Sequence, residues 1–308
     1  MPLIILLYCL FASSFTIGKS ALENCSPLAF ISIRMAIAGL GMLAIASWQN
    51  PRALLQLTSS QWRCLGLLAL FNIYLTNALE FWALEKLPSA TTCFYYSLSP
   101  FLAALLSWLR LGERLTSRQL TGLVVGFLGF LPILWQESQG GSFISLSFGW
   151  AELSISAAVF TSVFGWILLK EAIATRQIGV LVANGISMLF GGLIALGHSL
   201  ISESWTPFPA ADISLFLYHS LLMLIISNGI CYSLYGYLLR HHSATWLSFC
   251  GFITPLATAL FGYLFLQETI SPVFLLSASV VFTGLFLFYQ DELAQERKLQ
   301  LRPQPVAS

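Results

Sequence analysis

The sequence has very little charge for its length. Only 9% of its 308 residues are Asp, Glu, Lys or Arg, whereas 57% are hydrophobic. A soluble globule of this size needs far more polar surface, so the composition excludes one. The net charge of +1 also argues against nucleic acid as a partner, because nucleic-acid-binding proteins usually carry a concentrated basic patch. The chain is predicted to be an all-α integral membrane protein whose surroundings are the lipid bilayer.

Clustered reactive side chains are missing as well. The six cysteines include no CxxC pair, and the sequence contains no HExxH, GxSxG or phosphate-cradling P-loop motif. The four histidines are His198, His219, His241 and His242. We therefore predict that the protein is not an enzyme and holds no metal or cofactor. Without a P-loop, coupling to ATP within this chain is not expected.

Ten apolar segments approach the length of about 20 residues that a membrane-spanning helix needs. They are predicted at residues 2–19, 28–47, 62–84, 88–110, 118–135, 149–170, 178–199, 213–239, 243–266 and 272–289. No Lys or Arg precedes the first segment, which favours a retained span over a signal peptide. The polar segment Gln136 to Ser147 divides the chain into units 1–139 and 140–290, followed by a charged tail, 291–308.

Lys and Arg are distributed unevenly between the predicted loops. With a cytoplasmic N-terminus, eleven of the fourteen fall in the inner loops and tail, and only Lys19 and Lys86 fall in outer loops. Positive residues concentrate on the cytoplasmic side of membrane proteins. We therefore predict an even number of spans, cytoplasmic N- and C-termini, and a location in the cell membrane, which in a bacterium is the inner membrane.

One sequence pattern occurs twice, in the fourth and ninth predicted spans. It consists of Ser or Thr, then Pro, then Glu thirteen residues after the proline: Ser99, Pro100 and Glu113, then Thr254, Pro255 and Glu268 at an offset of 155 residues. Each half has five predicted spans, and an odd number inserts the second copy upside down. Inverted repeats are typical of secondary transporters with a substrate site near the midplane. The pattern predicts transport by alternating access.

These motifs resemble the drug/metabolite transporter superfamily, in its EamA-type branch. The resemblance extends from the first span to Tyr289 and is most specific at Ser99–Pro100 with Gly112–Thr116 and at Thr254–Pro255 with Gln267–Thr269. The second copy has Gln267 where a glycine would be usual. The resemblance implies a central cavity lined mainly by spans 1, 3, 4, 6, 8 and 9. It also implies export of small metabolites, typically amino acids.

Several functional alternatives stay open. We expect a secondary transporter that exports amino acids or related compounds. An importer or exchanger of a nucleoside-like or sulfonium metabolite is the alternative, because the aromatic residues suit a stacked base. Proton exchange by Glu80 or Glu152 would make it an antiporter, and otherwise it is a facilitator or exchanger. A non-transporting scaffold is the alternative from another class, and both monomer and homodimer are open.

Ionisable residues inside spans are functional candidates, because Arg or Asp at a helix centre costs about 2.5 to 3.5 kcal/mol. Arg34 in the second span and Glu80 in the third lie at similar depths, about 9 Å from the outer boundary. We hypothesise that they pair, or together face the cavity and hold a zwitterionic substrate. Alternatively, Arg34 snorkels to the headgroups. Glu152 is either a cavity carboxylate or a helix-start acid, and His219 either titrates or bonds between helices.

Neutral polar and aromatic residues are the candidates for the substrate wall, because cavities for organic metabolites combine apolar walls with a few hydrogen-bonding groups. They are Asn72, Tyr74, Asn77, Trp82, Tyr95, Trp166, Asn228, Tyr232 and Tyr235. The alternative is packing between helices or in the interfacial belt.

Two further pairs follow from the repeat. Pro100 and Pro255 each remove a backbone hydrogen bond in mid-span, so both are hinge candidates, with a static kink as the alternative. Glu113 and Glu268 at helix ends are predicted to be structural.

Overall fold

The computed structural model describes residues 2–51, 54, 56–87, 92, 95–96, 98–112, 115–139, 149–205, 208–254, 256–257 and 272–300. These residues form helices and one isolated β-bridge, between Cys25 and Ala210. Six of the described helical stretches are long and apolar enough to cross a membrane. An all-helical membrane protein is therefore confirmed, as the physics of a bilayer requires, because spanning helices satisfy their own backbone hydrogen bonds.

The described helices of the first half overlap the predicted spans, and in the span predicted at 88–110 the named helix begins at Ser99. They are α1 (Pro2–Leu22), α2 (Pro27–Gln49), α3 (Ser59–Leu68), η1 (Ala69–Leu75), α4 (Thr76–Lys86), α6 (Ser99–Leu111) and α7 (Ser117–Gln139). The third predicted span is one continuous stretch made of α3, the π-helix η1 and α4.

The second half contains α8 (Trp150–Lys170), the π-helix η2 (Glu171–Thr175), α9 (Val180–Ser202), α10 (Ile213–Met223), the π-helix η3 (Leu224–Cys231), α11 (Tyr232–Leu238), α12 (Ala244–Cys250) and α14 (Pro272–Gln300). The π-helices η1 and η3 begin at Ala69 and Leu224, which are separated by the same 155 residues as the sequence repeat. Helix α14 continues to Gln300, so the predicted charged tail begins as helix.

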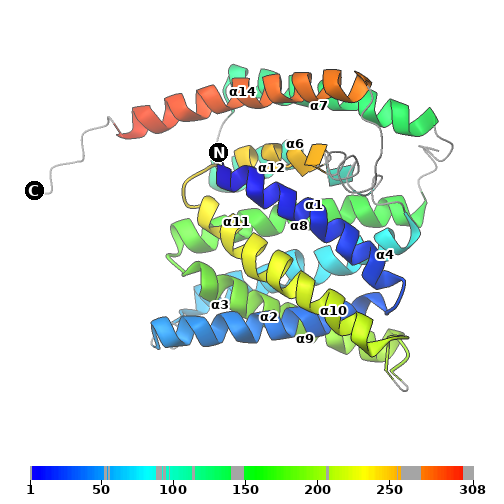
Figure 1. Cartoon of the computed structure of the whole chain (residues 1–308). Helices are drawn as coiled ribbons and strands as arrows, with labels where there is room; N and C mark the ends of the chain where they lie inside the picture. Colours follow the sequence, from blue (N-terminus) through cyan, green and yellow to red (C-terminus); the bar gives the residue numbers. More distant parts are fainter. Residues whose placement is uncertain are drawn as a thin grey trace, which may run out of the picture.

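Each half contributes one partner to the main helix pairs. In Figure 1, α7 and α14 lie along the top, α2 and α9 lie along the bottom, and most of the other helices lie between these pairs. Between them, α1 packs against α10, α4 against α8, and α6 against α12. Exchanging the two halves at the 155-residue offset turns the α1–η3 contact into the α8–η1 contact, and both contacts are present. The packing therefore follows the internal repeat.

Glycines bring the outer helix pairs into backbone contact. A Cβ atom on Gly39 of α2 would lie 2.5 Å from the backbone nitrogen of Leu189 in α9. A Cβ on Gly284 of α14 would lie 2.6 Å from the carbonyl oxygen of Gly122 in α7. Small residues at helix crossings are typical of membrane proteins, since lipid gives no hydrophobic drive for association and close packing replaces it.

Side chains from neighbouring segments cap two helix ends. The Glu203 carboxylate accepts hydrogen bonds from the backbone N–H groups of Leu28 and Ala29, both at 2.8 Å, in the first turn of α2. The Lys19 Nζ donates to the carbonyl oxygen of Leu84 at the end of α4, at 2.5 Å. An acid at a helix N-terminus and a base at a C-terminus both satisfy free backbone groups and complement the helix dipole.

The prolines and glutamates of the repeated pattern are only partly described. Pro100 lies in the first turn of α6 and not in the middle of a continuous helix, so its missing N–H removes no intrahelical bond. Helix α6 ends at Gly112, whose left-handed φ of 69° is typical of a C-terminal cap. Pro255, Glu113 and Glu268 lie outside the described residues. The expected kink at Pro100 is thus replaced by a helix start.

The glycine crossings generate a prediction with an internal control. Gly39→Ala should destabilise the protein by about 1–3 kcal/mol, because the added methyl group meets backbone atoms of α9 that cannot move aside. Gly41→Ala, two residues away, meets nothing within 4 Å and should be neutral or stabilising by up to about 1 kcal/mol. Thermal unfolding of both purified variants in detergent measures the difference, and equal melting temperatures would contradict the crossing.

Candidate functional site

A cavity of about 150 Å³ lies in the middle of the helical bundle. Its described lining comes from α1, α2, α4, α6, α8, α10, η3, α11 and α12, together with Tyr96, Gly251, Phe252 and Thr254. These segments belong to the spans that the family resemblance implied, with Arg34 of α2 added. Of the thirteen residues predicted for the cavity, six line it: Arg34, Asn77, Glu80, Trp166, Tyr232 and Tyr235.

Among the described residues that line this cavity, Arg34 is the only basic one. Its side chain is 1% exposed, and its Nη2 donates a hydrogen bond to Asn77 Oδ1 at 3.1 Å. The guanidinium carbon lies 5.3 Å from the ring centroids of both Phe30 and Phe81, a distance at which aromatic faces attract a cation. The Nε of Arg34 has no hydrogen-bond partner.

Glu80, three residues and nearly one helical turn after Asn77 in α4, supplies the cavity's carboxylate. One carboxylate oxygen accepts a hydrogen bond from the Tyr96 hydroxyl. Glu80 and Arg34 interact electrostatically, but within the described part of the chain no ion pair joins them. The cavity therefore contains two opposite charges, each held by a neutral partner.

Aromatic rings form another part of the wall. The Trp166 ring of α8 stacks on Tyr235 of α11, with centroids 4.0 Å apart, and lies 5.0 Å from Tyr232. Phe11 of α1 contacts the edge of Tyr235, and Tyr8 donates its hydroxyl hydrogen to the carbonyl oxygen of Leu247. This aromatic surface links α1, α8 and α11 beside the charged residues.

The lining follows the internal repeat. Six pairs of lining residues are separated by 155 positions: Tyr8 and Val163, Phe11 and Trp166, Asn77 and Tyr232, Glu80 and Tyr235, Tyr96 and Gly251, and Ser99 and Thr254. The frame of the cavity is thus pseudo-symmetric, but the residues at paired positions differ in chemistry. Asn77 and Glu80 of α4 are matched by two tyrosines of α11.

Two other predicted residues lie in a separate groove of about 1320 Å³. The Tyr74 hydroxyl is 3.0 Å from Nδ1 of His198, and the Trp82 ring lies under the Lys86 ammonium group at 4.9 Å. The groove is built where α1 and α9 end and α8 begins. Trp82 is exposed there, as an interfacial aromatic residue would be.

The remaining candidates are not among the residues that line the central cavity. The Asn228 amide donates to the sulfur of Met35 at 2.9 Å, and Asn72 packs against Gly165. His219 is buried in α10 with its Nδ1 unpaired. Glu152 lies in the first turn of α8, where it interacts electrostatically with Tyr95.

Sequence reasoning missed several lining residues, chiefly Tyr8, Phe11, Phe81 and Tyr96. Their spans are apolar all round, so periodicity does not reveal which face is turned inward. The repeat offset could have found Phe11, because it corresponds to Trp166.

Comparisons with known proteins agree with this architecture. The model of the EamA-like transporter family matches residues 1–135 and 149–290. A protein of Chlamydia trachomatis serovar L2 named S-adenosylmethionine/S-adenosylhomocysteine transporter is 36% identical over 291 residues, covering 93% of this chain and 88% of its own. The protein of that name from Chlamydia muridarum is 36% identical over 293 residues, covering 93% and 90%.

More distant relatives extend the comparison. Protein PecM of Dickeya dadantii is 26% identical over 291 residues, covering 94% of this chain and 92% of its own. A solved protein structure superimposes with a TM-score of 0.75 at 16% identity, covering 96% of this chain and 98% of the other. At this identity the structural match supports the fold alone.

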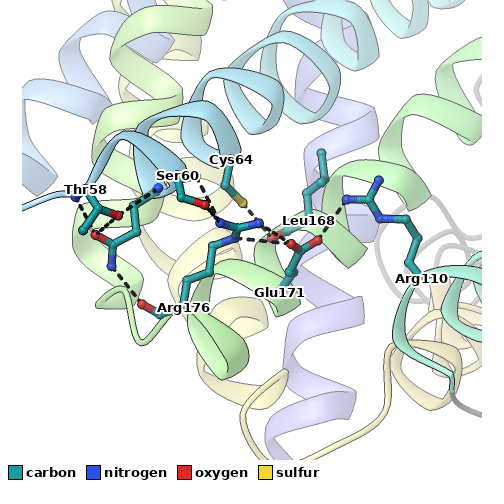
Figure 2. A network of polar contacts seen from close by, with 8 residues as sticks. Thr58, Ser60, Cys64, Arg110, Leu168, Glu171 and Arg176 are labelled. Atoms are coloured by element: carbon teal, nitrogen blue, oxygen red, sulfur yellow. Dashed lines mark hydrogen bonds and ion pairs between the residues drawn. The ribbon is translucent and has the colours of Figure 1, made fainter.

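A polar junction ties three helical segments together away from the cavity (Figure 2). Glu171 in η2 accepts hydrogen bonds from Arg176 Nη2 at 2.6 Å and from Arg110 Nη2, at the end of α6, at 3.0 Å. Arg176 Nη1 also donates to the carbonyl oxygen of Ser60 in α3, at 3.1 Å. The bonds to Glu171 raise the pKa of Arg176 above its usual value, so this guanidinium stays charged. The Glu171 carboxylate thus links η2 to α6 directly and to α3 through Arg176.

This junction yields a stability prediction. Glu171→Gln should lower stability by about 1–2 kcal/mol, because two arginines lose their shared, largely buried anion. Glu85→Gln serves as the control, because Glu85 is half exposed and forms a long ion pair of 4.0 Å with Lys86. This substitution should change stability by less than about 0.5 kcal/mol. Thermal unfolding in detergent compares the variants. A melting temperature for Glu171→Gln equal to that of the control would show that the junction is not stabilising.

Proposed function

The chain belongs to the EamA-like transporter family, and we propose that it carries S-adenosylmethionine and S-adenosylhomocysteine across the membrane by alternating access. Its chlamydial relatives are named as transporters of a small metabolite and not as enzymes, in agreement with the family. The chlamydial relatives align over nearly the whole chain, and their name agrees with a nucleoside-like or sulfonium substrate. Amino-acid export, the expectation from sequence, receives no support from them.

The observation that carries this proposal is the aromatic surface beside a charged region in one cavity. Adenine stacks on aromatic rings, and a sulfonium cation is attracted to their faces. Trp166, Tyr232 and Tyr235 provide such rings. A substrate that is only an amino acid would leave this surface without a partner, whereas an adenosyl compound would use it.

The size of the cavity fits a transporter that must open. Sites for drug-sized ligands occupy about 300–1,000 Å³, and the cavity measures about 150 Å³. A drug-sized substrate is larger than this cavity, so the surrounding helices need to move apart to admit it. The π-helices η1 and η3 and the helix start at Pro100 place irregular backbone close to the cavity, where such movement is expected.

We extend the proposal to the topology. It comprises ten spans as two inverted repeats, residues 1–139 and 140–290, with both termini cytoplasmic in a bacterial inner membrane. The recurring π-helices, the exchange of helix contacts between halves and the uneven distribution of Lys and Arg support it. The relatives' name pairs S-adenosylmethionine with S-adenosylhomocysteine. This pairing favours exchange of one compound for the other over coupling to protons.

Counterflow in proteoliposomes tests the substrate. Labelled S-adenosylmethionine should enter vesicles loaded with unlabelled S-adenosylmethionine or S-adenosylhomocysteine. Trp166→Leu should weaken apparent affinity about tenfold or more, since stacking of a base on an aromatic ring contributes about 1–3 kcal/mol. Trp108→Leu, at an exposed position of α6, is the matched control and should behave as wild type. Tracer exchange with amino acids and none with adenosyl compounds would refute the proposal.

Reporter fusions test the topology. A fluorescent protein attached after Ser308 should fluoresce, because it stays in the cytoplasm. Alkaline phosphatase fused after Lys86 should be active, because this loop faces outward, whereas the same enzyme fused after Arg176 should be inactive. Phosphatase activity in a C-terminal fusion would contradict the even number of spans.

A further inference from the structure

The two charges in the cavity are arranged as separate binding groups. Arg34 is almost fully buried, yet its nearest hydrogen-bond partner is the neutral amide of Asn77. Glu80 is likewise held by the hydroxyl of Tyr96. Within the described residues, neither forms an ion pair. Both side chains line the same cavity, so a ligand in the cavity can reach both.

The surroundings of Arg34 indicate that an anion belongs beside it. A buried cation is costly unless it is paired and hydrogen-bonded. Here the rings of Phe30 and Phe81 approach the guanidinium, Asn77 uses one nitrogen, and Nε has no partner. The guanidinium fork matches a carboxylate, with which it forms two parallel hydrogen bonds. The missing partner therefore has the chemistry of a carboxylate.

Resting on the proposed function, we propose that Arg34 is the carboxylate subsite of the cavity. It binds the α-carboxylate of the adenosyl amino acid, while Glu80, oriented by Tyr96, receives the α-ammonium group. The carboxylate and ammonium of one amino acid then neutralise the two buried charges together. Arg34 selects adenosyl amino acids over adenosyl compounds that lack the carboxylate.

The repeat separates this subsite from the one for the base. Asn77 and Glu80 lie on α4 in the first half of the chain, and their counterparts at the 155-residue offset are Tyr232 and Tyr235 on α11. The amino-acid end of the ligand therefore lies toward the first half and the adenine toward the aromatic rings. A ligand bound this way has one orientation in a cavity with a pseudo-symmetric frame.

A pair of ligands tests the subsite directly. S-adenosylmethionine and its decarboxylated analogue differ only by the carboxylate, and both are measured as competitors of labelled S-adenosylhomocysteine binding to purified protein. In wild type the analogue should bind about 30-fold more weakly, equivalent to about 2 kcal/mol at 1.4 kcal/mol per tenfold change. In Arg34→Gln this ratio should fall to about one.

Three variants keep the result interpretable. Arg34→Lys retains the cation and should retain most of the preference for the carboxylate. Glu80→Gln changes the charge of the same cavity by one unit but should not lower the ratio. Arg63→Gln removes an exposed arginine and should match wild type. Thermal unfolding identifies any misfolded variant. The ratio of the two ligand affinities in wild type is measured without any substitution, so misfolding does not affect it.

The outcomes separate the two proposals. If S-adenosylmethionine does not compete with wild-type protein, and no adenosyl compound exchanges in vesicles, the proposed function fails. If S-adenosylmethionine binds but its decarboxylated analogue binds equally well, only the carboxylate subsite is refuted. A preference that survives in folded Arg34→Gln also refutes it, because another group then binds the carboxylate.

Discussion

Backbone contact at glycines is the interaction on which the rest of this structure depends. Lipid offers helices no hydrophobic reason to associate, so close packing has to hold the two halves together. Gly39 in the α2–α9 pair and Gly284 in the α7–α14 pair provide it on opposite sides of the bundle. Because these outer pairs join the halves, the helices between them can be lined with polar and aromatic groups and can enclose a cavity.

The central helices show how the polar groups are tolerated. Near the end of η1, polar side chains add hydrogen bonds to backbone carbonyls that also accept from the backbone N–H of Thr76. Thr76 donates to the carbonyl oxygen of Phe71 at 2.7 Å, and the Asn77 amide nitrogen donates to that of Ile73 at 2.8 Å. The amide oxygen of Asn77 accepts a hydrogen bond from Arg34. Asn77 therefore couples the irregular backbone of η1 to the charge in the cavity.

Sequence patterns predict the fold better than the site. Long apolar runs and the 155-residue repeat establish the helices and their pseudo-symmetry, and the cost of burying charge identifies Arg34 and Glu80. Sequence does not reveal which neutral side chains face inward, because each helix contacts apolar surroundings on all sides. Asn228 therefore bonds to Met35, Trp82 lies in a peripheral groove, and Tyr96 was missed. Pro100 lies in the first turn of α6, a position that proline favours, and not in mid-span as the predicted span length suggested.

In the proposed mechanism, a symmetric frame with unequal chemistry would let one chain both alternate between two conformations and discriminate between ligands. Two similar halves give two conformations of similar energy, as alternating access requires. Identical side chains in both halves would let a ligand bind in two orientations. Placing Asn77 and Glu80 opposite Tyr232 and Tyr235 removes this ambiguity. Keeping Arg34 and Glu80 apart has a second effect: had they formed an ion pair, a zwitterion would have to break it before binding, and much of its own attraction would be lost.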